Sequence, residues 1–355
     1  MIAQTVDVLC VGLGPAGACA SAAAASHGAR VVAVDRRHEP GLPVQCAEFV
    51  PALIGSEIDV LFHCVCQRIA SMDTFVESQP VDHMAPFPGH MLDRAAFDAH
   101  LAAEAVRAGA ECRFGTAVRA VGMDGIVTLS DGTRIAPRVV IGADGPRSII
   151  GRAIGQVNRA LVETRQLTVP LLVPHEATDI FLSASIRGGY AWLFPKGEIA
   201  NLGAGVEPAH SETLKAIVAS LHERLANEGR VGREVLSRTG GAIPVGGPLV
   251  PRGAFGEVPV LLAGDAAGLA NPVTGAGIAA AVQSGKLAGE AAAIFLEGHP
   301  QALDDYEDEL DAVFGLSLAR ALHRREELLR AAPSPDALRR GWIAYPEYWN
   351  EGTHP

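Results

Sequence analysis

The chain has 355 residues, of which 48% are hydrophobic and 19% charged, which is the composition of a folded protein and not of a disordered one. Its length favours two packing units over a single core. A formal net charge of −11 argues against nucleic acid as a partner, because nucleic-acid binding needs a basic surface.

The cysteines and the uncharged segments indicate in which cellular compartment the protein is expected. None of the six cysteines belongs to a C-x-x-C pair, and Cys64 with Cys66 is poor zinc spacing, so we expect no metal site and a reducing cytoplasm. The uncharged segments 8–29 and 266–285 contain glycine and proline, which disfavours a signal peptide or a membrane span. Peripheral contact with a membrane stays open.

The N-terminal segment carries the strongest pattern. Strands are predicted at 6–11 and 30–34, with an alanine-rich helix between them that ends near residue 27. The turn before the helix reads Gly12-Leu13-Gly14-Pro15-Ala16-Gly17. Its glycines permit a tight bend and close approach to a pyrophosphate, which the helix N-terminus attracts. Asp35 follows the second strand, where an acid binds a ribose hydroxyl, so the segment predicts dinucleotide binding. A glycine-rich turn in another parallel sheet is the alternative.

The remaining elements differ in their hydrophobic period. A helix is predicted at 92–109, and strands at 111–113, 117–123, 126–129, 139–143 and 258–263. Alternating segments predict a mainly antiparallel sheet from 164–172, 179–186, 190–195 and 201–206, with helices at 212–228, 277–296 and 303–329.

These elements define an α/β protein with a discontinuous nucleotide domain. We predict a Rossmann-like domain made from 1–62, 90–154 and 256–298. Residues 63–89 and 155–255 form an inserted, mainly antiparallel substrate domain, and 299–355 form a C-terminal helical region.

Two further turns place an acid at the end of a predicted parallel strand. Asp265, in Gly264-Asp265-Ala266-Ala267-Gly268, precedes the glycine loop 275–277 and a helix. An aspartate there can bind polyol hydroxyls, since ligands of parallel sheets bind at the strands' carboxyl ends; helix capping is the alternative. Asp144 lies in the segment 142–148, GADGPRS, and its alternative is a carboxylate bonded to local backbone.

In this order, the three motifs resemble those of FAD-binding oxidoreductases of the aromatic-hydroxylase structural class. The resemblance implies that the first motif holds the ADP pyrophosphate, Asp35 the adenosine ribose, and Asp265 the ribityl chain or pyrophosphate. Arg94 matches an arginine that contacts FAD in that class, and its pairing with Asp98 at i+4 is the alternative. The candidate cofactor-binding residues are Gly12, Gly14, Pro15, Ala16, Gly17, Asp35, Arg36, Arg94, Val118, Asp144, Gly264, Asp265, Gly275, Gly277 and Ile278.

Residues 188–196 carry the pattern that distinguishes families within the class. A strand puts Tyr190, Trp192 and Phe194 on one face, as a ligand wall or as ordinary core. Their sequence resembles the Y-x-W-x-F-P signature of the geranylgeranyl reductase family, FAD enzymes that saturate prenyl double bonds. Arg187 stands where that signature has proline. The loop 43–48, PVQCAE, is similar to that family's cysteine-bearing segment near the flavin, or it is a plain connection.

The resemblance implies an FAD-dependent oxidoreductase that reduces C=C bonds of a prenyl or lipid-like substrate. Hydride transfer to an unpolarised alkene needs a proton at the other carbon, and Cys46, Tyr190 and Trp192 are the candidate catalytic residues. An FAD monooxygenase or halogenase-like enzyme, or an electron carrier with no substrate of its own, are the alternatives. No second nucleotide motif occurs, so we expect NAD(P)H or a protein such as ferredoxin to reduce the flavin transiently.

Overall fold

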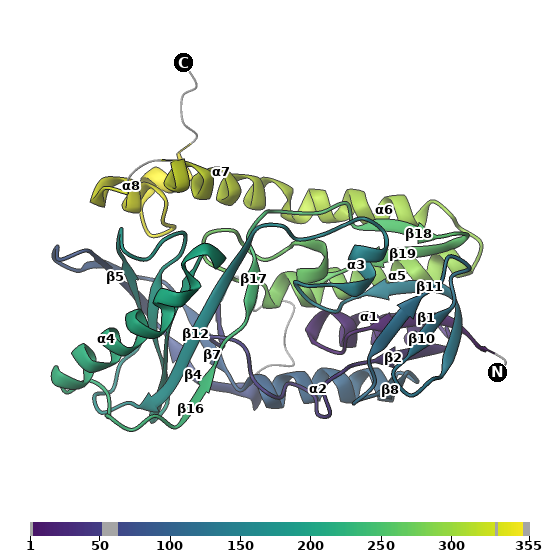
Figure 1. Ribbon diagram of the computed structural model, residues 1–355, viewed down its shortest axis with the longest axis horizontal. Coiled ribbons are helices and arrows are strands. Elements are labelled where there is room, and N and C mark those ends of the chain that lie inside the picture. Colours follow the sequence, from purple (N-terminus) through teal and green to yellow (C-terminus); the bar gives the residue numbers. More distant parts are fainter. Residues whose placement is uncertain (1–2, 52–62, 331–332, 351–355) are drawn as a thin grey trace, which may run out of the picture.

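Two large sheets form the two halves of an elongated molecule (Figure 1). The computed structural model describes residues 3–51, 63–330 and 333–350. The half with the N-terminus contains a mostly parallel sheet, and the other half contains a mainly antiparallel one. A series of helices from the C-terminal part of the chain runs along both halves.

The first sheet has the strand order β18-β19-β11-β1-β2-β8, with the hairpin of β9 and β10 attached to β11. The inner strands are nearly continuous apolar runs because a parallel sheet is covered on both faces. The bounds are β1 Gln4–Val11, β2 Val31–Val34, β8 Glu111–Arg113, β9 Val118–Val121, β10 Val127–Leu129, β11 Arg134–Gly142, β18 Arg252–Phe255 and β19 Val258–Leu262.

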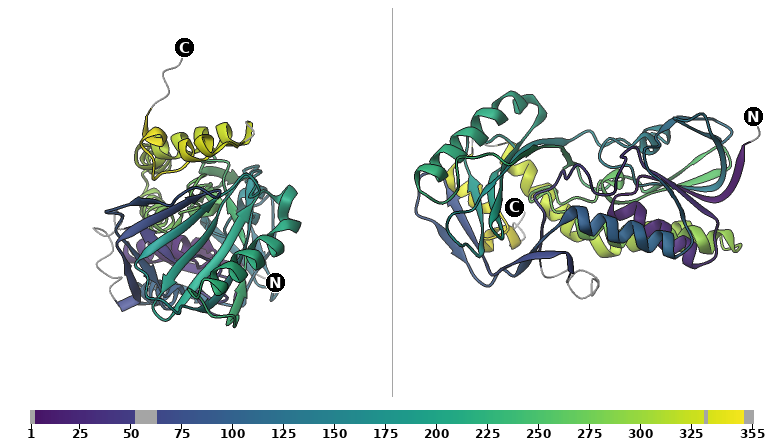
Figure 2. Two further views of the ribbon diagram at one scale, coloured as in Figure 1. Left: turned by 90° about the vertical axis from the view of Figure 1, so that its left-hand side faces the viewer. Right: turned by 90° about the horizontal axis from the view of Figure 1, so that it is seen from below.

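Three helices pack together beside this sheet: α1 (Pro15–Ser26), α2 (Arg94–Arg107) and α5 (Ile278–Leu296) (Figure 2). The alanine-rich sequence of α1 allows a very close approach to α5. A Cβ atom added to Gly285 of α5 would lie 2.2 Å from the backbone oxygen of Ala16. This contact fixes the N-terminus of α5 next to the glycine turn.

The second sheet has the strand order β16-β12-β15-β14-β13-β5-β6, with β17 also paired to β12. Helix α4 (Leu214–Asn227) covers one of its faces. The bounds are β5 Ser71–Val76, β6 Asp82–Met84, β12 Leu161–Pro170, β13 Ala177–Leu182, β14 Ala191–Lys196, β15 Ile199–Val206, β16 Ser237–Thr239 and β17 Ala242–Pro244.

A small sheet and the C-terminal helices complete the described chain. The order β3-β7-β4 joins Phe49–Pro51, Gly89–Leu92 and Val65–Ile69. The remaining helices are α3 (Ile149–Ala153), α6 (Ala302–Leu310), α7 (Leu316–Arg330), α8 (Pro335–Arg340) and α9 (Pro346–Trp349), with single turns at Pro208–Thr213, Gly264–Ala267 and Asp311–Gly315.

The predicted α/β class, with a Rossmann-like sheet, an antiparallel sheet and C-terminal helices, is confirmed. Several element bounds were wrong in detail. The helix predicted at 303–329 is interrupted by the π-helical turn Asp311–Gly315, and the strand predicted at 179–186 is β13, Ala177–Leu182. Strand β11, predicted at 139–143, begins at Arg134, because its first residues already pair with β10 on one side and β1 on the other. The division into domains stays a prediction, and residues 52–62 lie outside the described residues. No helix of the described chain is long and apolar enough to cross a membrane.

Candidate functional site

The glycine turn between β1 and α1 gives each of its glycines a different role. Gly12 has a φ of +98°, and a Cβ there would lie 2.3 Å from the oxygen of Ala143. A Cβ on Gly17 would lie 1.7 Å from the oxygen of Gly12. Gly14 faces open space, and as the N-cap of α1 it supplies no side chain to its N–H groups. The turn therefore has the free backbone and helix N-terminus that a pyrophosphate needs.

Asp35 lies against this turn. Its Oδ2 accepts a 2.7 Å hydrogen bond from the Leu13 amide, and its Oδ1 accepts one of 2.8 Å from the Arg37 amide. Each oxygen keeps a second lone pair that a ribose hydroxyl could use. Arg36 is exposed beside it, whereas Val118 is buried at the start of β9. Their assignment to the cofactor stays a prediction.

The three glycine-and-acid motifs converge, although they are far apart in the sequence. Gly12 packs on Ala143 and Asp144, and a Cβ on Gly264 would lie 3.0 Å from the Cβ of Ala16. The side-chain amide of Asn158 donates to the backbone oxygen of Asp265 at 2.8 Å and to that of Pro146 at 3.1 Å, which joins two of the motifs directly. Pro15 and Ala16 begin α1 at this junction.

Asp144 bonds only to neighbouring residues. It accepts hydrogen bonds from the Ser148 hydroxyl and, at 2.6 Å, from the Ile149 amide. Burial raises its pKa, although these hydrogen bonds oppose the shift. The observed contacts are those of the local-backbone alternative, and a direct contact with a cofactor stays a prediction.

Among the acids of the three motifs, Asp265 has the largest shift in pKa. It lies beside Gly277, the N-cap of α5, whose added Cβ would be 3.3 Å from Asp265 Oδ1. Burial raises the pKa of Asp265 to about 6, and the charge of Arg94 partly opposes that rise. Gly275, with a φ of +70°, and Ile278, the first residue of α5, flank the same turn. No described residue donates a hydrogen bond to the Asp265 carboxylate, which leaves its oxygens free to accept from the hydroxyls of a polyol.

Arg94 begins α2 and forms the i+4 pair with Asp98, whereas its contact with FAD stays a prediction. Its Nε and Nη2 donate to Asp98 at 3.0 and 3.1 Å, which is the i+4 pair. Burial disfavours its charge, but Cys46 and Asp98 outweigh burial and raise the pKa of Arg94. Its guanidinium thus lies within electrostatic reach of both Cys46 and Asp265.

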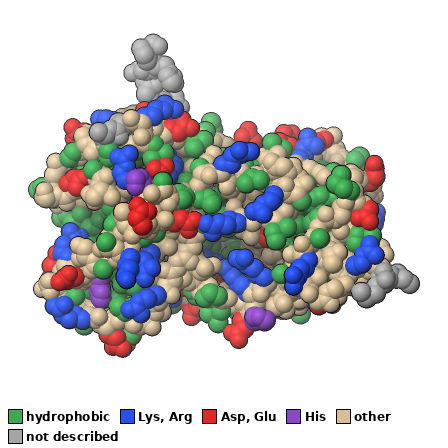
Figure 3. Space-filling view, in the orientation of Figure 1, with side chains coloured by type: hydrophobic (Ala, Val, Ile, Leu, Met, Phe, Trp, Pro, Cys, Tyr) green, Lys and Arg blue, Asp and Glu red, His purple; other side chains and the backbone are tan. Residues whose placement is uncertain are grey.

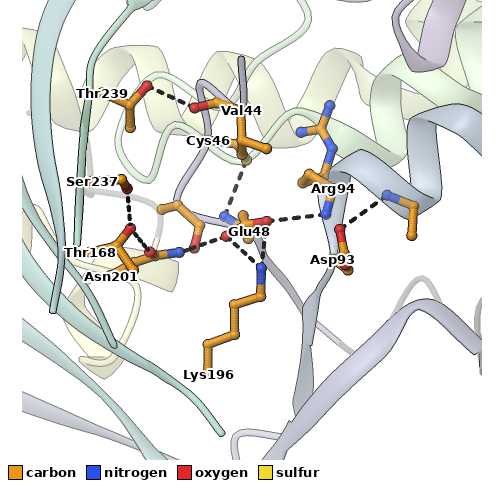
Figure 4. Close-up of polar contacts among 12 residues, drawn as sticks. Val44, Cys46, Glu48, Asp93, Arg94, Thr168, Lys196, Asn201, Ser237 and Thr239 are labelled. Atoms are coloured by element: carbon orange, nitrogen blue, oxygen red, sulfur yellow. Dashed lines mark hydrogen bonds and ion pairs between the residues drawn. The ribbon is translucent and has the colours of Figure 1, made fainter. Parts of the chain in front are cut away.

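The Cys46 loop is held by a buried carboxylate that the sequence did not single out (Figure 4). Glu48 is 4% exposed, and both of its oxygens accept hydrogen bonds from Lys196 Nζ at 2.9 Å. Asn201 donates to Glu48 at 2.8 Å, and the Arg94 amide donates at 3.1 Å. The Glu48 amide in turn donates to Cys46 Sγ at 3.2 Å. This network joins the loop, α2 and the second sheet.

The aromatic residues lie together, as expected of one strand face. The ring centroids of Tyr190 and Trp192 are 5.7 Å apart, and those of Trp192 and Phe194 are 6.2 Å apart. Trp192 and Phe194 are buried in a core cluster that includes Trp342, so these two have the surroundings of ordinary core. Tyr190 keeps partial exposure, and burial of its hydroxyl raises its pKa.

Gln166 connects this aromatic cluster to the Cys46 loop. Its Oε1 accepts from Trp192 Nε1 at 3.2 Å, and its Nε2 donates to the Cys46 oxygen at 3.1 Å. Neither Gln166 nor the Glu48–Lys196 pair was predicted. One feature of the sequence could have predicted the pair. Glu48 and Lys196 are the last residues of the two motifs 43–48 and 188–196, and each is the only charged residue in its motif.

The fold and site define the class of FAD-dependent oxidoreductases. Residues 162–243 match the family model described as the geranylgeranyl reductase catalytic domain. The chain is 34% identical over 340 residues to digeranylgeranylglycerophospholipid reductase 2 of Methanopyrus kandleri, covering 89% of this chain and 85% of that protein. It is 34% identical over 356 residues to the digeranylgeranylglycerophospholipid reductase of Methanothrix thermoacetophila, covering 91% and 88%. The chain therefore belongs to the geranylgeranyl reductase family.

Solved structures agree with this fold. A geranylgeranyl bacteriochlorophyll reductase-like protein from Thermoplasma acidophilum superimposes with a TM-score of 0.84 at 27% identity, covering 95% of this chain and 90% of that one. A probable FAD-dependent monooxygenase from Pseudomonas aeruginosa gives a TM-score of 0.70 at 21% identity, covering 94% and 98%. The similarity to the monooxygenase shows a shared fold and nothing about activity.

Gly14→Ala tests whether FAD lies on the glycine turn. The added methyl group enters open space at an ordinary φ of −71°, so the apoprotein should stay folded and lose no more than about 1 kcal/mol, the usual cost of alanine in place of glycine at an N-cap. The same methyl group should weaken FAD binding by about tenfold or more, because the pyrophosphate approaches this backbone. A flavin fluorescence titration measures the affinity. Unchanged affinity would mean that the pyrophosphate lies elsewhere.

Proposed function

We propose that this protein reduces C=C bonds in the prenyl chains of an isoprenoid lipid, with FAD as its redox cofactor. The observation that carries the proposal is that hydrogen bonds through Glu48 and Gln166 join the Cys46 loop to Arg94 and to Trp192 of the family's aromatic signature. The names of the curated relatives support the same substrate class.

An apolar cavity beside the cofactor turn supports an apolar substrate. It has a volume of about 160 Å³ and lies between β3, the start of α5 and the start of α7. Phe49, Ile278, Phe314 and Leu318 are among the residues that line it. Burying prenyl carbon contributes about 0.8 kcal/mol per CH₂ group, so even part of a chain would bind usefully here.

The proposed roles follow from the observed contacts. When bound, reduced FAD supplies hydride equivalents to the alkene. Gly14, Asp35 and Asp265 hold the cofactor, and Arg94 provides a positive charge beside it. The Tyr190 hydroxyl donates to the Thr274 oxygen at 2.6 Å, so it is fully protonated and already committed as a donor. Cys46 is then the better candidate to deliver the proton, and Trp192 supports its loop through Gln166.

The electron donor and the location are part of the proposal. We propose that NAD(P)H or a ferredoxin-like protein reduces the flavin in a transient encounter. A substrate with long prenyl chains resides in a membrane, so the protein would work from the cytoplasm in peripheral contact with the bilayer.

The direct test is single-turnover reduction under anaerobic conditions. The FAD-loaded protein, reduced with dithionite, should add two hydrogens per flavin, which saturates one double bond of a digeranylgeranyl glycerophospholipid, as measured by mass spectrometry. Cys46→Ala should retain FAD but slow the reaction by about 100-fold, the usual contribution of a proton donor. Cys112→Ala on β8, in the first sheet, is the matched control and should react normally.

One result would contradict the proposal: an unchanged lipid together with rapid oxygen uptake when an aromatic substrate and NAD(P)H are added, which identifies a monooxygenase. Full activity of Cys46→Ala would exclude Cys46 as the proton donor and leave the reductase assignment intact.

A further inference from the structure

A positively charged cavity lies on the face of the second sheet that carries α4. It has a volume of about 390 Å³, within the usual range for small-molecule sites. Its lining residues come from β12, the turn before α4, the start of α4, and β16 with the residue after it. They are Thr164, Arg165, Ser211, Leu214, Lys215, Arg238, Thr239 and Gly240.

The strand register explains why two arginines meet there. Arg165 lies two residues before Leu167 on β12, so both side chains project from the same face of the sheet. Leu167 packs in the core beneath α4, and its partner across the strand pair is Arg238 of β16. Both guanidinium groups therefore project on the side of α4, where Lys215 occupies the first turn of that helix.

These three cations have no negative counterpart. No acidic residue lines the cavity, and among the described residues none of the three forms an ion pair. Lys and Arg side chains gather over α4, β12 and β16 on the face shown in Figure 3. In a chain with a net charge of −11, a concave group of three cations without acidic neighbours is a local positive potential that attracts an anion from solution.

We propose that this cavity binds the phosphate group of a small molecule. Two guanidinium groups and an ammonium group provide forked and point-charge donors to phosphate oxygens, and the Ser211 hydroxyl adds one more. The concave shape and the volume favour a small molecule over an extended protein or nucleic-acid surface.

The rim of the cavity is bonded to the Cys46 loop. Gln45 Nε2 donates to the Gly240 oxygen at 2.9 Å, and the Thr239 hydroxyl donates to the Val44 oxygen at 2.7 Å. An occupant would thus lie across the edge strand β16 from the proposed reaction site. A phosphate there belongs either to a lipid headgroup or to a nucleotide.

Binding to the FAD-loaded protein tests the site without using enzymatic activity. FAD occupies the pyrophosphate site, so inorganic phosphate, dioctanoyl phosphatidic acid and adenosine 2′-phosphate can be titrated calorimetrically against the cavity. Arg238→Gln and Arg165→Gln should each weaken binding of all three probes by about tenfold. Arg119→Gln, an equal charge change on the exposed part of β9, is the control and should have no effect.

The outcomes separate the sources of the phosphate. Tighter binding of phosphatidic acid than of phosphate supports the site with a lipid headgroup, and tighter binding of adenosine 2′-phosphate supports it with a nucleotide. Equal affinities support a site that recognises phosphate alone. Absence of saturable binding, or equal weakening by Arg119→Gln, would overturn the proposal and leave the reductase function untouched.

Discussion

Lys196→Met should lower the free energy of unfolding by about 3–5 kcal/mol, the usual cost of leaving one member of a buried ion pair uncompensated. Glu48 is 4% exposed, and the side chain of Lys196 is 14% exposed. Without the ammonium group, the carboxylate keeps only neutral donors, from Asn201 and the Arg94 amide. Denaturant unfolding at neutral pH measures the change.

A double variant separates the charge from the shape of the site. Glu48→Gln with Lys196→Met should recover part of the stability, because it removes the buried charge, although the single amide oxygen can accept from only one of the two donors, Asn201 or the Arg94 amide. Lys286→Met, on the exposed side of α5, is the matched control and should change little. If the double variant is as unstable as the single one, packing of the lysine stem and not the ion pair is responsible.

The same pair is expected to matter for function through Cys46. Glu48 has a φ of +70°, a conformation that is unfavourable for a side-chain-bearing residue and persists only where its surroundings impose it. Because its amide donates to Cys46 Sγ, loss of the network should displace the thiol. Glu48 is thus a positioning residue, and its loss should affect the proposed reduction more than FAD binding.

The sequence predicted the cofactor half of the site because that half depends on local geometry. A strand, a glycine turn and a helix specify their own arrangement within a few residues, and parallel strands bring their carboxyl ends to one edge. The convergence of Gly12, Asp144 and Gly264 could be expected on those grounds.

The other half depends on tertiary packing and was not predictable. Lys196 reaches Glu48 across 148 residues, and no periodicity encodes that contact. The alternation in β14 correctly grouped Tyr190, Trp192 and Phe194, but it carries no information about what covers them. Trp342, whose ring centroid lies 4.8 Å from that of Tyr190, provides part of that cover from the C-terminal segment.

Asp265→Asn should change stability and FAD affinity in opposite directions. Burial raises the pKa of Asp265 from 3.8 to about 6, so between these values the folded protein binds more protons than the unfolded chain. The free energy of unfolding therefore falls as the pH rises from about 4 to 6, and the cost of the ionised carboxylate remains above pH 6. Two pKa units correspond to about 3 kcal/mol, which asparagine would recover in the apoprotein at pH 7.5.

The gain should shrink as the pH is lowered towards 4.5, where the wild-type carboxyl is already protonated in the folded state. FAD affinity should meanwhile fall by about 10- to 100-fold, since a neutral amide replaces a charged acceptor.

Asp131→Asn is the control. Hydrogen bonds from Thr133 lower the pKa of Asp131, which is the opposite of the shift at Asp265, so this variant should show no increase in the free energy of unfolding. A stabilised variant with normal FAD affinity would exclude Asp265 from the cofactor site, and a destabilised one would assign it to the fold. Loss of affinity with a gain in stability means that the folded chain keeps a buried charge because the cofactor needs it.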